Sequence, residues 1–244
     1  MPMPTARAQH PHKRRHPPTG GYARGDETRA KIVAAALEVF GTYGFAGAST
    51  RLLAEKAGVN LPALQYYFDG KAGVYLACAE HIAQRLEARL GPIIKDITHV
   101  LASEAPSREH LFALLHGFLD TYADLLVGER EVEDWVLFII REQAHPTKAF
   151  DIIFDRVFHR AVRTCAMLVG PLLDLPSGDP KVLVRALAFI GQVLFFRTAR
   201  AAVLRIQGWP DVKGDRLALV KSALREQVTA ALGGAARAAR RRRS

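Results

Sequence analysis

The chain has 244 residues, a formal net charge of +10 and only two cysteines. This length can bury a sizeable core, whereas two distant cysteines, Cys78 and Cys165, provide neither a disulfide framework nor a zinc site. The longest clearly apolar run, residues 135–140, is too short to span a bilayer, and residues 1–18 lack the apolar segment of a secretory signal. We therefore expect a cytoplasmic protein in a reducing compartment, with no membrane partner.

The excess positive charge lies at the two ends of the chain. Residues 1–24 and residues 235–244 each hold five basic residues and no acidic one, so the remainder is formally neutral. Both ends are rich in Pro, Gly, Ala and Arg, and we expect two disordered tails. The tails act either as a solubilising fringe or as arms that bind DNA phosphates without regard to sequence.

Between the tails, the sequence predicts an all-α chain. Leu, Ala, Val, Ile and Phe dominate, and strand-like alternation is almost absent. The first helix is predicted from Asp26 to Tyr43, with Gly44 ending it and Phe45 plugging the core of an N-terminal three-helix head. The apolar stripe of this helix consists of Ile32, Val33, Ala36, Leu37 and Phe40.

Residues 49–71 have the pattern of two short helices joined by a tight turn. The first helix is predicted over Thr50 to Ala57 and the second over Leu61 to Tyr67. Ala54 is small enough for a close helix crossing, and Gly58 suits a left-handed position that other residues adopt only with strain.

The second short helix also has clear starting signals. Asn60 is a good N-cap, Pro62 fits the first turn, and Leu64 is apolar on the inner face. A small residue, a glycine four residues later and an apolar residue six beyond that is the spacing of a DNA-reading helix-turn-helix.

The flanking sequence extends this pattern to a family resemblance. The run RAKIVAAALEVFGTYGFAGAST, residues 29–50, resembles the first helix and the Y-G-F…T link of TetR-type regulators. The run LQYYFDGKAGVYLA, residues 64–77, resembles their Y-x-F-x-x-K-x-x-L signature. The resemblance implies a DNA-binding domain at 25–70, followed at 71–234 by a helical domain that binds an effector and forms a homodimer.

The resemblance also points to DNA contacts on the two short helices. In the family, the residues that match Thr50 and Arg51 face DNA, and either Ser49 or Thr50 caps the first helix. Arg51 suits guanine or a phosphate, whereas the amide of Gln65 suits adenine. The complete set of expected DNA contacts is Thr50, Arg51, Asn60, Leu61, Pro62, Ala63, Gln65, Tyr66, Tyr67 and Lys71.

Three of these contacts have specific arguments. Tyr66 and Tyr67 match family positions that contact the DNA backbone, although packing of the rings within the head is the alternative interpretation. Asp69 is expected to cap the next helix, with Lys71 in its first turn. Because a helix N-terminus disfavours a cation, we expect Lys71 to reach a phosphate that is bound there.

The remaining chain is predicted to be a series of helices. The helix after Lys71 should continue to Leu90 and then break or kink at Pro92, which lacks a backbone N–H. This break is either a hinge or a plain helix boundary. Further helices are predicted at about 93–103, 107–127, 131–144, 147–170, 179–207 and 213–232.

The residues 138–154, FIIREQAHPTKAFDIIF, resemble the effector domain of the CecR-like branch of TetR regulators. Polar groups interleave with aromatic ones around this segment, so they are expected to line a pocket, with a packed core plus surface charges as the alternative. The expected effector-binding residues are Trp135, Phe138, Arg141, Glu142, His145, Phe158, Gln192, Phe195 and Phe196. Gln143, Phe154, Arg163, Thr164 and Arg197 belong to the same interleaved pattern. The last two long helices, at 181–205 and 215–232, are where the family forms its dimer.

The function that these observations favour is a ligand-responsive transcriptional repressor. It would bind a near-palindromic operator as a homodimer and leave it when a small-molecule effector binds. An enzyme is not expected, because GTYGFAG follows a helix and is no nucleotide loop, and Glu142 and His145 have no further metal ligands at matching spacing. We therefore expect neither a metal nor a cofactor. The alternative function is a non-specific, nucleoid-type DNA-binding protein, which the basic tails favour.

Overall fold

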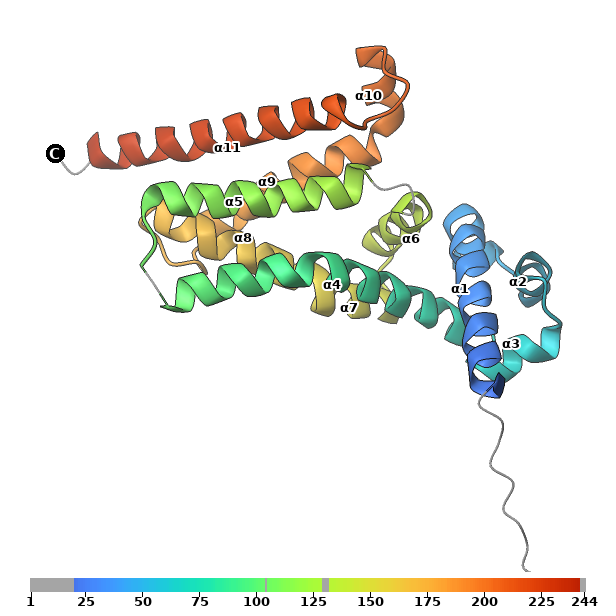
Figure 1. Cartoon of the computed structure of the whole chain (residues 1–244). Coiled ribbons are helices and arrows are strands. Elements are labelled where there is room, and N and C mark those ends of the chain that lie inside the picture. The colour runs from blue at the N-terminus through green and yellow to red at the C-terminus, as the bar shows by residue number, and fades with distance from the viewer. Residues whose placement is uncertain (1–19, 104, 129–131, 242–244) are drawn as a thin grey trace, which may run out of the picture.

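The computed structural model describes residues 20–103, 105–128 and 132–241, and within these ranges every regular element is a helix (Figure 1). The predicted all-α fold is confirmed. In chain order the elements are α1 (Gly20–Gly47), α2 (Thr50–Ala57), α3 (Leu61–Phe68), α4 (Lys71–Ser103), α5 (Arg108–Ala123), η1 (Asp124–Gly128), α6 (Val132–Ala144), α7 (Lys148–Ile153), η2 (Phe154–Phe158), α8 (His159–Leu172), α9 (Pro180–Thr198), α10 (Arg200–Gln207) and α11 (Asp215–Arg241). The segments η1 and η2 are single π-helical turns.

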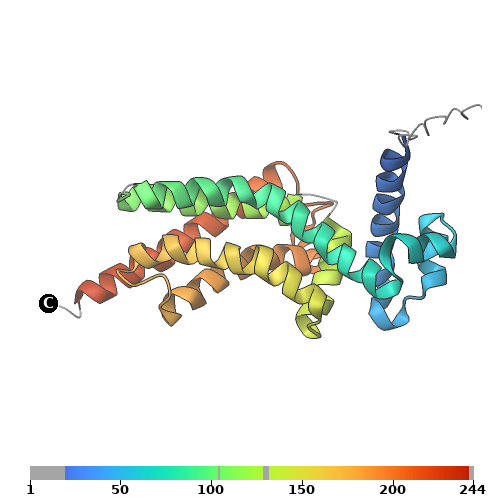
Figure 2. The same ribbon diagram turned by 90° about the horizontal axis from the view of Figure 1, so that it is seen from below.

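The head is formed by α1, α2 and α3, and it lies at one end of an elongated helical body (Figure 2). α4 leaves the head and runs along the body, α5 and α8 pack beside it, and α11 lies over α5 on the side away from α4 (Figure 1). One hydrophobic cluster extends through both parts, from Ile32 in α1 to Leu232 in α11. Head and body therefore share a continuous core.

α1 begins earlier than predicted, and its regular path is interrupted at Gly44, where its end was predicted. Its backbone is helical from Gly20, so residues 20–24 belong to the helix rather than to a tail. Gly44 has φ 70° and ψ 176°, which interrupts the helical path. Phe45 packs against Phe40 and Tyr75 but remains 41% exposed, so it borders the core rather than plugging it. The rest of the expected N-terminal tail, residues 1–19, lies outside the described residues.

The two short helices have the predicted caps. The Oγ of Ser49 accepts a hydrogen bond from the Leu52 amide at 3.1 Å, and the Oδ1 of Asn60 accepts one from the Ala63 amide at 2.9 Å. Gly58 has φ 64° and ψ 34°, the left-handed conformation that the turn requires. These local interactions explain why α2 and α3 begin and end where the sequence indicates.

Of the predicted break or kink at Pro92, the break is wrong. α4 continues through this proline as one helix, and the segment 93–103 is not separate. A proline in a helix interior removes one backbone hydrogen bond, and here the packing on both sides offsets that loss. Leu90 and Ile97, on either side of the proline, are both buried in the common core.

Two long helices of the C-terminal half differ in how they match the prediction. The expected helix at 147–170 is continuous from Lys148 to Leu172, with the π-helical turn η2 between α7 and α8, whereas the expected helix at 179–207 bends by 74° between α9 and α10. α11 continues to Arg241, so residues 235–241 lie in a helix where a disordered tail was expected. Residues 242–244 lie outside the described residues.

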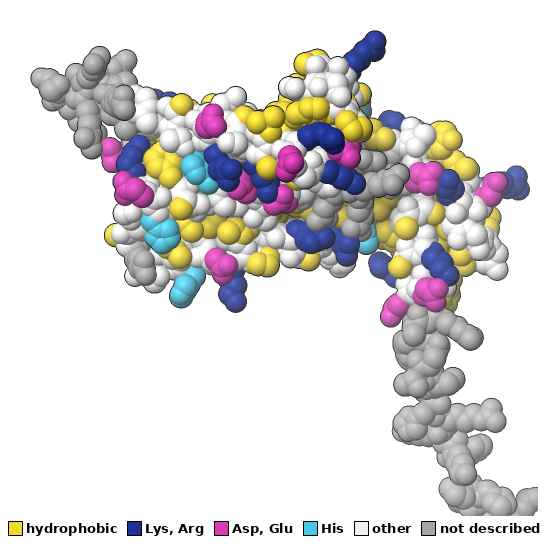
Figure 3. Space-filling view, turned by 45° about the horizontal axis from the view of Figure 1, so that its top comes forward, with side chains coloured by type: hydrophobic (Ala, Val, Ile, Leu, Met, Phe, Trp, Pro, Cys, Tyr) yellow, Lys and Arg dark blue, Asp and Glu magenta, His cyan; other side chains and the backbone are white. Residues whose placement is uncertain are grey.

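The surface of the body carries both signs of charge. Lys and Arg side chains are interspersed with Asp and Glu over the face in Figure 3, as expected for a body that is formally neutral. The segment Arg108–Gly128 is long and apolar enough to cross a membrane by length and composition, but half of its most apolar window is buried inside the protein. Its apolar residues therefore serve the core, where Leu115 and Phe118 are fully buried.

Candidate functional site

The outer face of α3 is the first candidate site. Leu64 and Phe68 are buried at 1% and 7% exposure and hold α3 on the head, whereas Leu61 and Tyr66 are 50% and 83% exposed. Pro62 and Gln65 are also exposed, and Ala63 is half-buried. The helix thus presents a mixed apolar and polar surface of the kind that enters a major groove.

The side chain of Gln65 is held by Asp69, which was expected to cap α4. Its Nε2 donates to the Oδ1 of Asp69 at 2.8 Å. Asp69 was expected to cap α4, but its backbone instead forms the left-handed C-cap of α3, with φ 55°. The Gln65 amide is therefore oriented by a carboxylate before any base is present, and pairing through its Nε2 would compete with this bond.

The two tyrosines occupy different environments. Tyr66 is largely exposed, and Tyr67 is half-buried between the rings of Tyr66 and Phe68, with centroids at 5.0 Å and 6.4 Å. The packing alternative therefore applies to Tyr67, whereas Tyr66 is available at the surface.

At the start of α2, Ser49 provides the cap, so that the Thr50 hydroxyl is not needed for this purpose. Thr50 is half-buried in the first turn, and Arg51 beside it is exposed. The remaining expected contact, Asn60, is exposed but uses its side-chain oxygen to cap α3. Its capping role is structural whether or not DNA is bound.

Lys71 has a structural role that was not predicted. Its Nζ donates to the carbonyl oxygens of Phe45 and Ala48, each at 3.0 Å, and lies 4.4 Å from the centre of the Phe45 ring. These contacts tie the start of α4 to the link between α1 and α2. Two carbonyl groups thus hold the ammonium that was expected to reach a phosphate.

A second region joins the head to the body through α6. Arg141 was expected to bind an effector, but its Nε donates to the carbonyl of Gly41 at 3.1 Å and its Nη2 donates to that of Thr42 at 2.9 Å. These carbonyls lie near the end of the regular part of α1, where a cation is favourable. Gly44 leaves room for this side chain, since a Cβ there would lie 3.1 Å from the Nη1 of Arg141.

Glu142 makes the next connection. Its side chain is buried, at 2% exposure, and accepts hydrogen bonds from the Tyr75 hydroxyl at 2.5 Å and from the amide and hydroxyl of Thr147 at 3.1 Å and 2.8 Å. Burial, followed by the hydrogen bond to Glu142, raises the pKa of Tyr75 well above its usual range. Glu142 thus connects α6 to α4 and to the start of α7 rather than lining a pocket.

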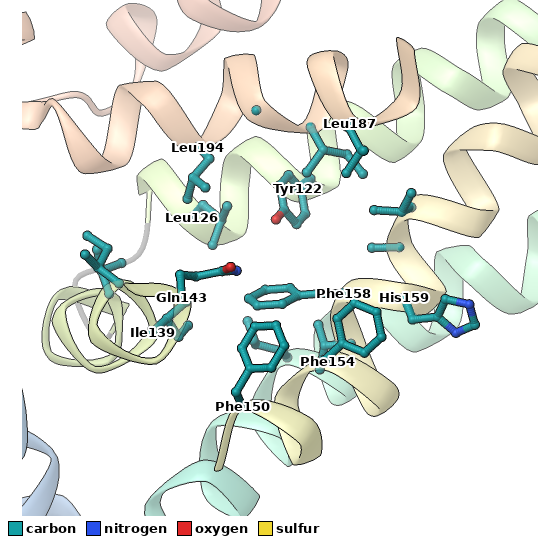
Figure 4. Close-up of a pocket in the computed structure, with 18 of the residues that line it drawn as sticks. Tyr122, Leu126, Ile139, Gln143, Phe150, Phe154, Phe158, His159, Leu187 and Leu194 are labelled. Atoms are coloured by element: carbon teal, nitrogen blue, oxygen red, sulfur yellow. The ribbon is translucent and has the colours of Figure 1, made fainter. Parts of the chain in front are cut away.

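A cavity of about 630 Å³ is bordered on one side by the same helix, α6 (Figure 4). Its wall is almost entirely apolar and comes from α4, α5, η1, α6, α7, η2, α8 and α9. Gln143 and Tyr122 direct polar groups into the cavity, whereas the ring of His159 points away from it (Figure 4). The wall is completed by Leu86, Leu126, Val136, Ile139, Ile140, Phe150, Phe154, Val157, Phe158, Ala161, Val162, Leu183, Leu187, Ile190, Gly191 and Leu194.

The wall includes only part of the expected effector-binding set. Phe158 lines the cavity, together with Gln143 and Phe154 from the same interleaved pattern. Trp135 and Phe138 are in the packed core, at 3% and 0% exposure. Their side chains fill the contact between α6 and its neighbours. A large apolar residue in a helix suits such a core position as well as a cavity wall, so the sequence does not distinguish the two.

The other expected members also lie outside the wall. His145 is exposed beyond the end of α6. On α9, Phe195 is 57% exposed, Phe196 packs edge-on against it, and Gln192 is half-buried. The Oε1 of Gln192 has no hydrogen-bond partner among the described residues. The cavity instead meets α9 on the side of Leu187, Ile190, Gly191 and Leu194.

The sequence analysis missed two features of this wall. Tyr122, in the middle of α5, was not considered, because a single tyrosine in an apolar helix has no distinguishing pattern. Phe150 was also missed, although Phe150, Phe154 and Phe158 recur at every fourth position and this spacing could have shown a common face. Phe150 and Phe154 do stack, with centroids 5.6 Å apart.

The outer side of η2 is tied to α4. Arg156 donates to the carboxylates of Glu80 and Glu87, and Arg160 lies 3.5 Å from Glu87. The hydrogen bond from Arg156 lowers the pKa of Glu87. The same π-helical turn therefore lines the cavity on one side and contacts the helix that leads to the head on the other. Among the described residues, no group of three His, Cys, Asp or Glu side chains is arranged to hold a metal ion.

Two family models match the chain. The model of bacterial regulatory proteins of the tetR family matches residues 32–78. The model of the C-terminal domain of the HTH-type transcriptional dual regulator CecR matches residues 108–235, more than half of the 244 residues.

Relatives of known role are transcription regulators. The HTH-type transcriptional dual regulator CecR of Shigella flexneri is 29% identical over 197 residues, covering 81% of this chain and 87% of that protein. The HTH-type transcriptional activator FasR of Mycolicibacterium smegmatis is 31% identical over 108 residues, covering 42% of this chain and 46% of that protein.

Solved structures share the fold. AibR, in complex with isovaleryl coenzyme A and operator DNA, has a TM-score of 0.60 at 12% identity, over 82% of this chain and 97% of that one. The regulator FadR of Bacillus subtilis, in complex with stearoyl-CoA, has a TM-score of 0.52 at 16% identity, over 82% and 96%. The two family models and the likeness to CecR show that the chain is a transcription regulator of the TetR family, in the branch that shares the CecR C-terminal domain.

Proposed function

We propose that this chain is a ligand-responsive repressor, which binds a near-palindromic operator as a homodimer and leaves it when a small molecule occupies the cavity. One observation carries the proposal. Three consecutive residues of α6 face three different partners: Arg141 contacts the carbonyls of α1, Glu142 contacts α4, and Gln143 points into the cavity. A movement of α6 caused by a ligand would therefore act directly on the helices that carry the head.

The response follows from differential binding. A ligand shifts DNA affinity only if it prefers the head positions that are unfavourable for DNA, and the size of the shift equals that preference. Coupling of about 1–3 kcal/mol, or roughly 5- to 150-fold in affinity, is typical of such systems. The hydrogen bonds of Arg141 and Glu142 are contacts that can differ between two such states, because each joins parts of the chain far apart in sequence.

The proposed DNA-reading surface is α3 with the first turn of α2. Leu61, Pro62 and Ala63 would contact thymine methyl groups, Gln65 would read adenine, and Tyr66 would contact the backbone. Thr50 and Arg51 at α2 would bind a phosphate or a guanine. We leave Lys71 out of this surface because carbonyl groups hold its ammonium.

The proposed dimer interface is formed by α9 and α11. α9 has an exposed apolar stripe that includes Val184, Leu187 and Phe195, at 65%, 54% and 57% exposure, and small residues lie between them. α11 adds Leu219, at 59% exposure. A twofold pairing of these helices would place two copies of α3 in successive major grooves, about 34–36 Å apart. We also propose that the protein acts in the cytoplasm.

Footprinting of the purified protein on the DNA that flanks its own gene tests the proposal. The expected result is a protected, near-palindromic site, a dimer in solution at micromolar concentration, and loss of affinity when the site is scrambled. A monomer would overturn the proposal. Equal affinity for the scrambled site would instead favour the non-specific, nucleoid-type alternative, in which the basic ends supply most of the binding energy.

A further inference from the structure

We infer that the effector is an uncharged, largely apolar compound with aromatic rings and a hydrogen-bond acceptor that binds the hydroxyl of Tyr122. This inference rests on the proposed function of the cavity as the effector site. It is drawn from the side chains of the wall, which together define the chemistry that the cavity can hold.

Charge is the first criterion. None of the described residues of the wall is Lys, Arg, Asp or Glu, and the ring of His159 points away from the cavity (Figure 4). A ligand with a carboxylate, sulfonate or phosphate inside the cavity would lose its hydration without gaining an opposite charge, and this loss strongly disfavours binding. The ligand that matches this wall therefore carries no formal charge within the cavity.

The hydroxyl of Tyr122 provides the second criterion. Its side chain is 5% exposed, and its hydroxyl makes no hydrogen bond to another described residue. The hydroxyl points into the cavity (Figure 4). Burial raises the pKa of Tyr122 well above its usual range, so the hydroxyl keeps its proton and can donate it. Because the hydroxyl faces the cavity without a partner in the protein, a carbonyl, ether or other neutral acceptor of the ligand is the group that fits beside it.

The shape and composition of the wall provide the third criterion. Phe150, Phe154 and Phe158 lie together on one side of the cavity, with the Gln143 amide beside Phe158 and with Tyr122 and Leu187 opposite (Figure 4). Ring faces of this kind favour offset or edge-on contact with other rings, and the Gln143 amide offers one donor group and one acceptor group. A volume of about 630 Å³ lies within the range of sites for drug-sized molecules.

Two fluorescent probes that differ by one sulfonate test the charge criterion. N-phenyl-1-naphthylamine is neutral, and 8-anilino-1-naphthalenesulfonate is its anionic counterpart. Titrated into the full chain without DNA, the neutral probe is expected to bind at least tenfold more tightly, which corresponds to about 1.4 kcal/mol. Leu194→Trp and Val162→Phe, which fill the cavity, should each weaken the neutral probe, whereas Ile206→Trp, at an 82% exposed position on α10, should not.

A second pair of compounds tests the hydrogen bond. Benzophenone and diphenylmethane differ mainly by one carbonyl, and both can be measured by displacement of the neutral probe. Tyr122→Phe is expected to weaken benzophenone roughly 3- to 10-fold, as for the loss of one hydrogen bond, and to leave diphenylmethane unchanged. Thermal unfolding of each variant shows whether it is folded.

The inference is overturned if the neutral probe does not bind, or if both cavity-filling variants fold and bind it as wild type does. It is also overturned if the anionic probe binds the cavity equally well, or if Tyr122→Phe weakens both displacing compounds alike. Because these titrations contain no DNA, they are independent of operator binding. A failed footprint with a sound probe result would contradict the proposed function alone.

Discussion

Tyr75 of α4 and Glu142 of α6 are joined by a hydrogen bond of 2.5 Å that links the helix leading to the head with the helix bordering the cavity. Both side chains are buried, at 7% and 2% exposure. Thr147 supplies the other donors to the same carboxylate. This buried connection lies between the two candidate sites, so its loss should affect both stability and communication.

Replacing Tyr75 by Phe should lower the free energy of unfolding by about 1–3 kcal/mol, because a buried carboxylate loses one of its donors. Urea denaturation measures the change. Glu142→Gln, which retains an acceptor for Tyr75, should be less harmful than Glu142→Ala. Equal stability of wild type and Tyr75→Phe would show that water replaces the missing hydroxyl.

At alkaline pH the stability should fall because of Tyr75 and Tyr122. Both have a pKa in the folded state above that of an unfolded tyrosine, which is about 10. Above pH 10 the unfolded chain releases these protons first, so each tyrosine lowers stability by up to about 1.4 kcal/mol per pH unit. Between pH 10 and 11 the unfolding free energy should fall less steeply with pH in Tyr75→Phe and in Tyr122→Phe than in wild type. An identical slope would contradict the assignment.

Arg141→Ala should uncouple the cavity from the head. The variant loses the hydrogen bonds to Gly41 and Thr42 but no residue of the cavity wall. We expect the affinity for the neutral probe to be unchanged. The operator affinity without ligand, divided by that with ligand, should fall toward one. Arg163→Ala, at an exposed arginine of α8, is the matched control. An unaltered ratio in Arg141→Ala would assign the coupling to other contacts, such as those of Arg156 with α4.

Lys71→Met and Arg51→Met should separate a structural from an electrostatic role. Lys71→Met removes two hydrogen bonds to the α1–α2 link and should lower the melting temperature, with little change in the dependence of log affinity on log salt. Arg51→Met should do the opposite and reduce that slope by about 0.9 if Arg51 binds one phosphate. A reduced slope in a folded Lys71→Met variant would restore the phosphate contact that the sequence predicts.

Gln65→Ala should cost about 1–3 kcal/mol on the operator and relax the preference at one base pair, which competition with single-base operator variants measures. Asp69→Asn tests the restraint on Gln65, because it replaces the carboxylate that accepts from the Gln65 amide. If DNA binding uses Nε2, Asp69→Asn should strengthen binding slightly. Equal losses at all base pairs would show that Gln65 does not read sequence.

Local signals explain how much could be predicted from the sequence. The helix-turn-helix was predictable because Ser49, Gly58 and Asn60 act through neighbours three or four residues away. The cavity was only partly predictable, because its wall joins residues that are distant in sequence, such as Leu86, Tyr122 and Leu194. Arg141 and Glu142 were assigned to the wrong partners for the same reason: a polar residue in an apolar helix fits a ligand or another helix equally well.

The continuity of α4 through Pro92 has a mechanical consequence. With a rise of 1.5 Å per residue, its 33 residues form a rod of roughly 50 Å. If its far end stays clamped in the body, a tilt of only about 6° would displace the other end by about 5 Å. That displacement exceeds the 3.4 Å between stacked base pairs. A sub-ångström shift of α4 close to its clamped end would therefore move its other end, at the head, by more than one base-pair step.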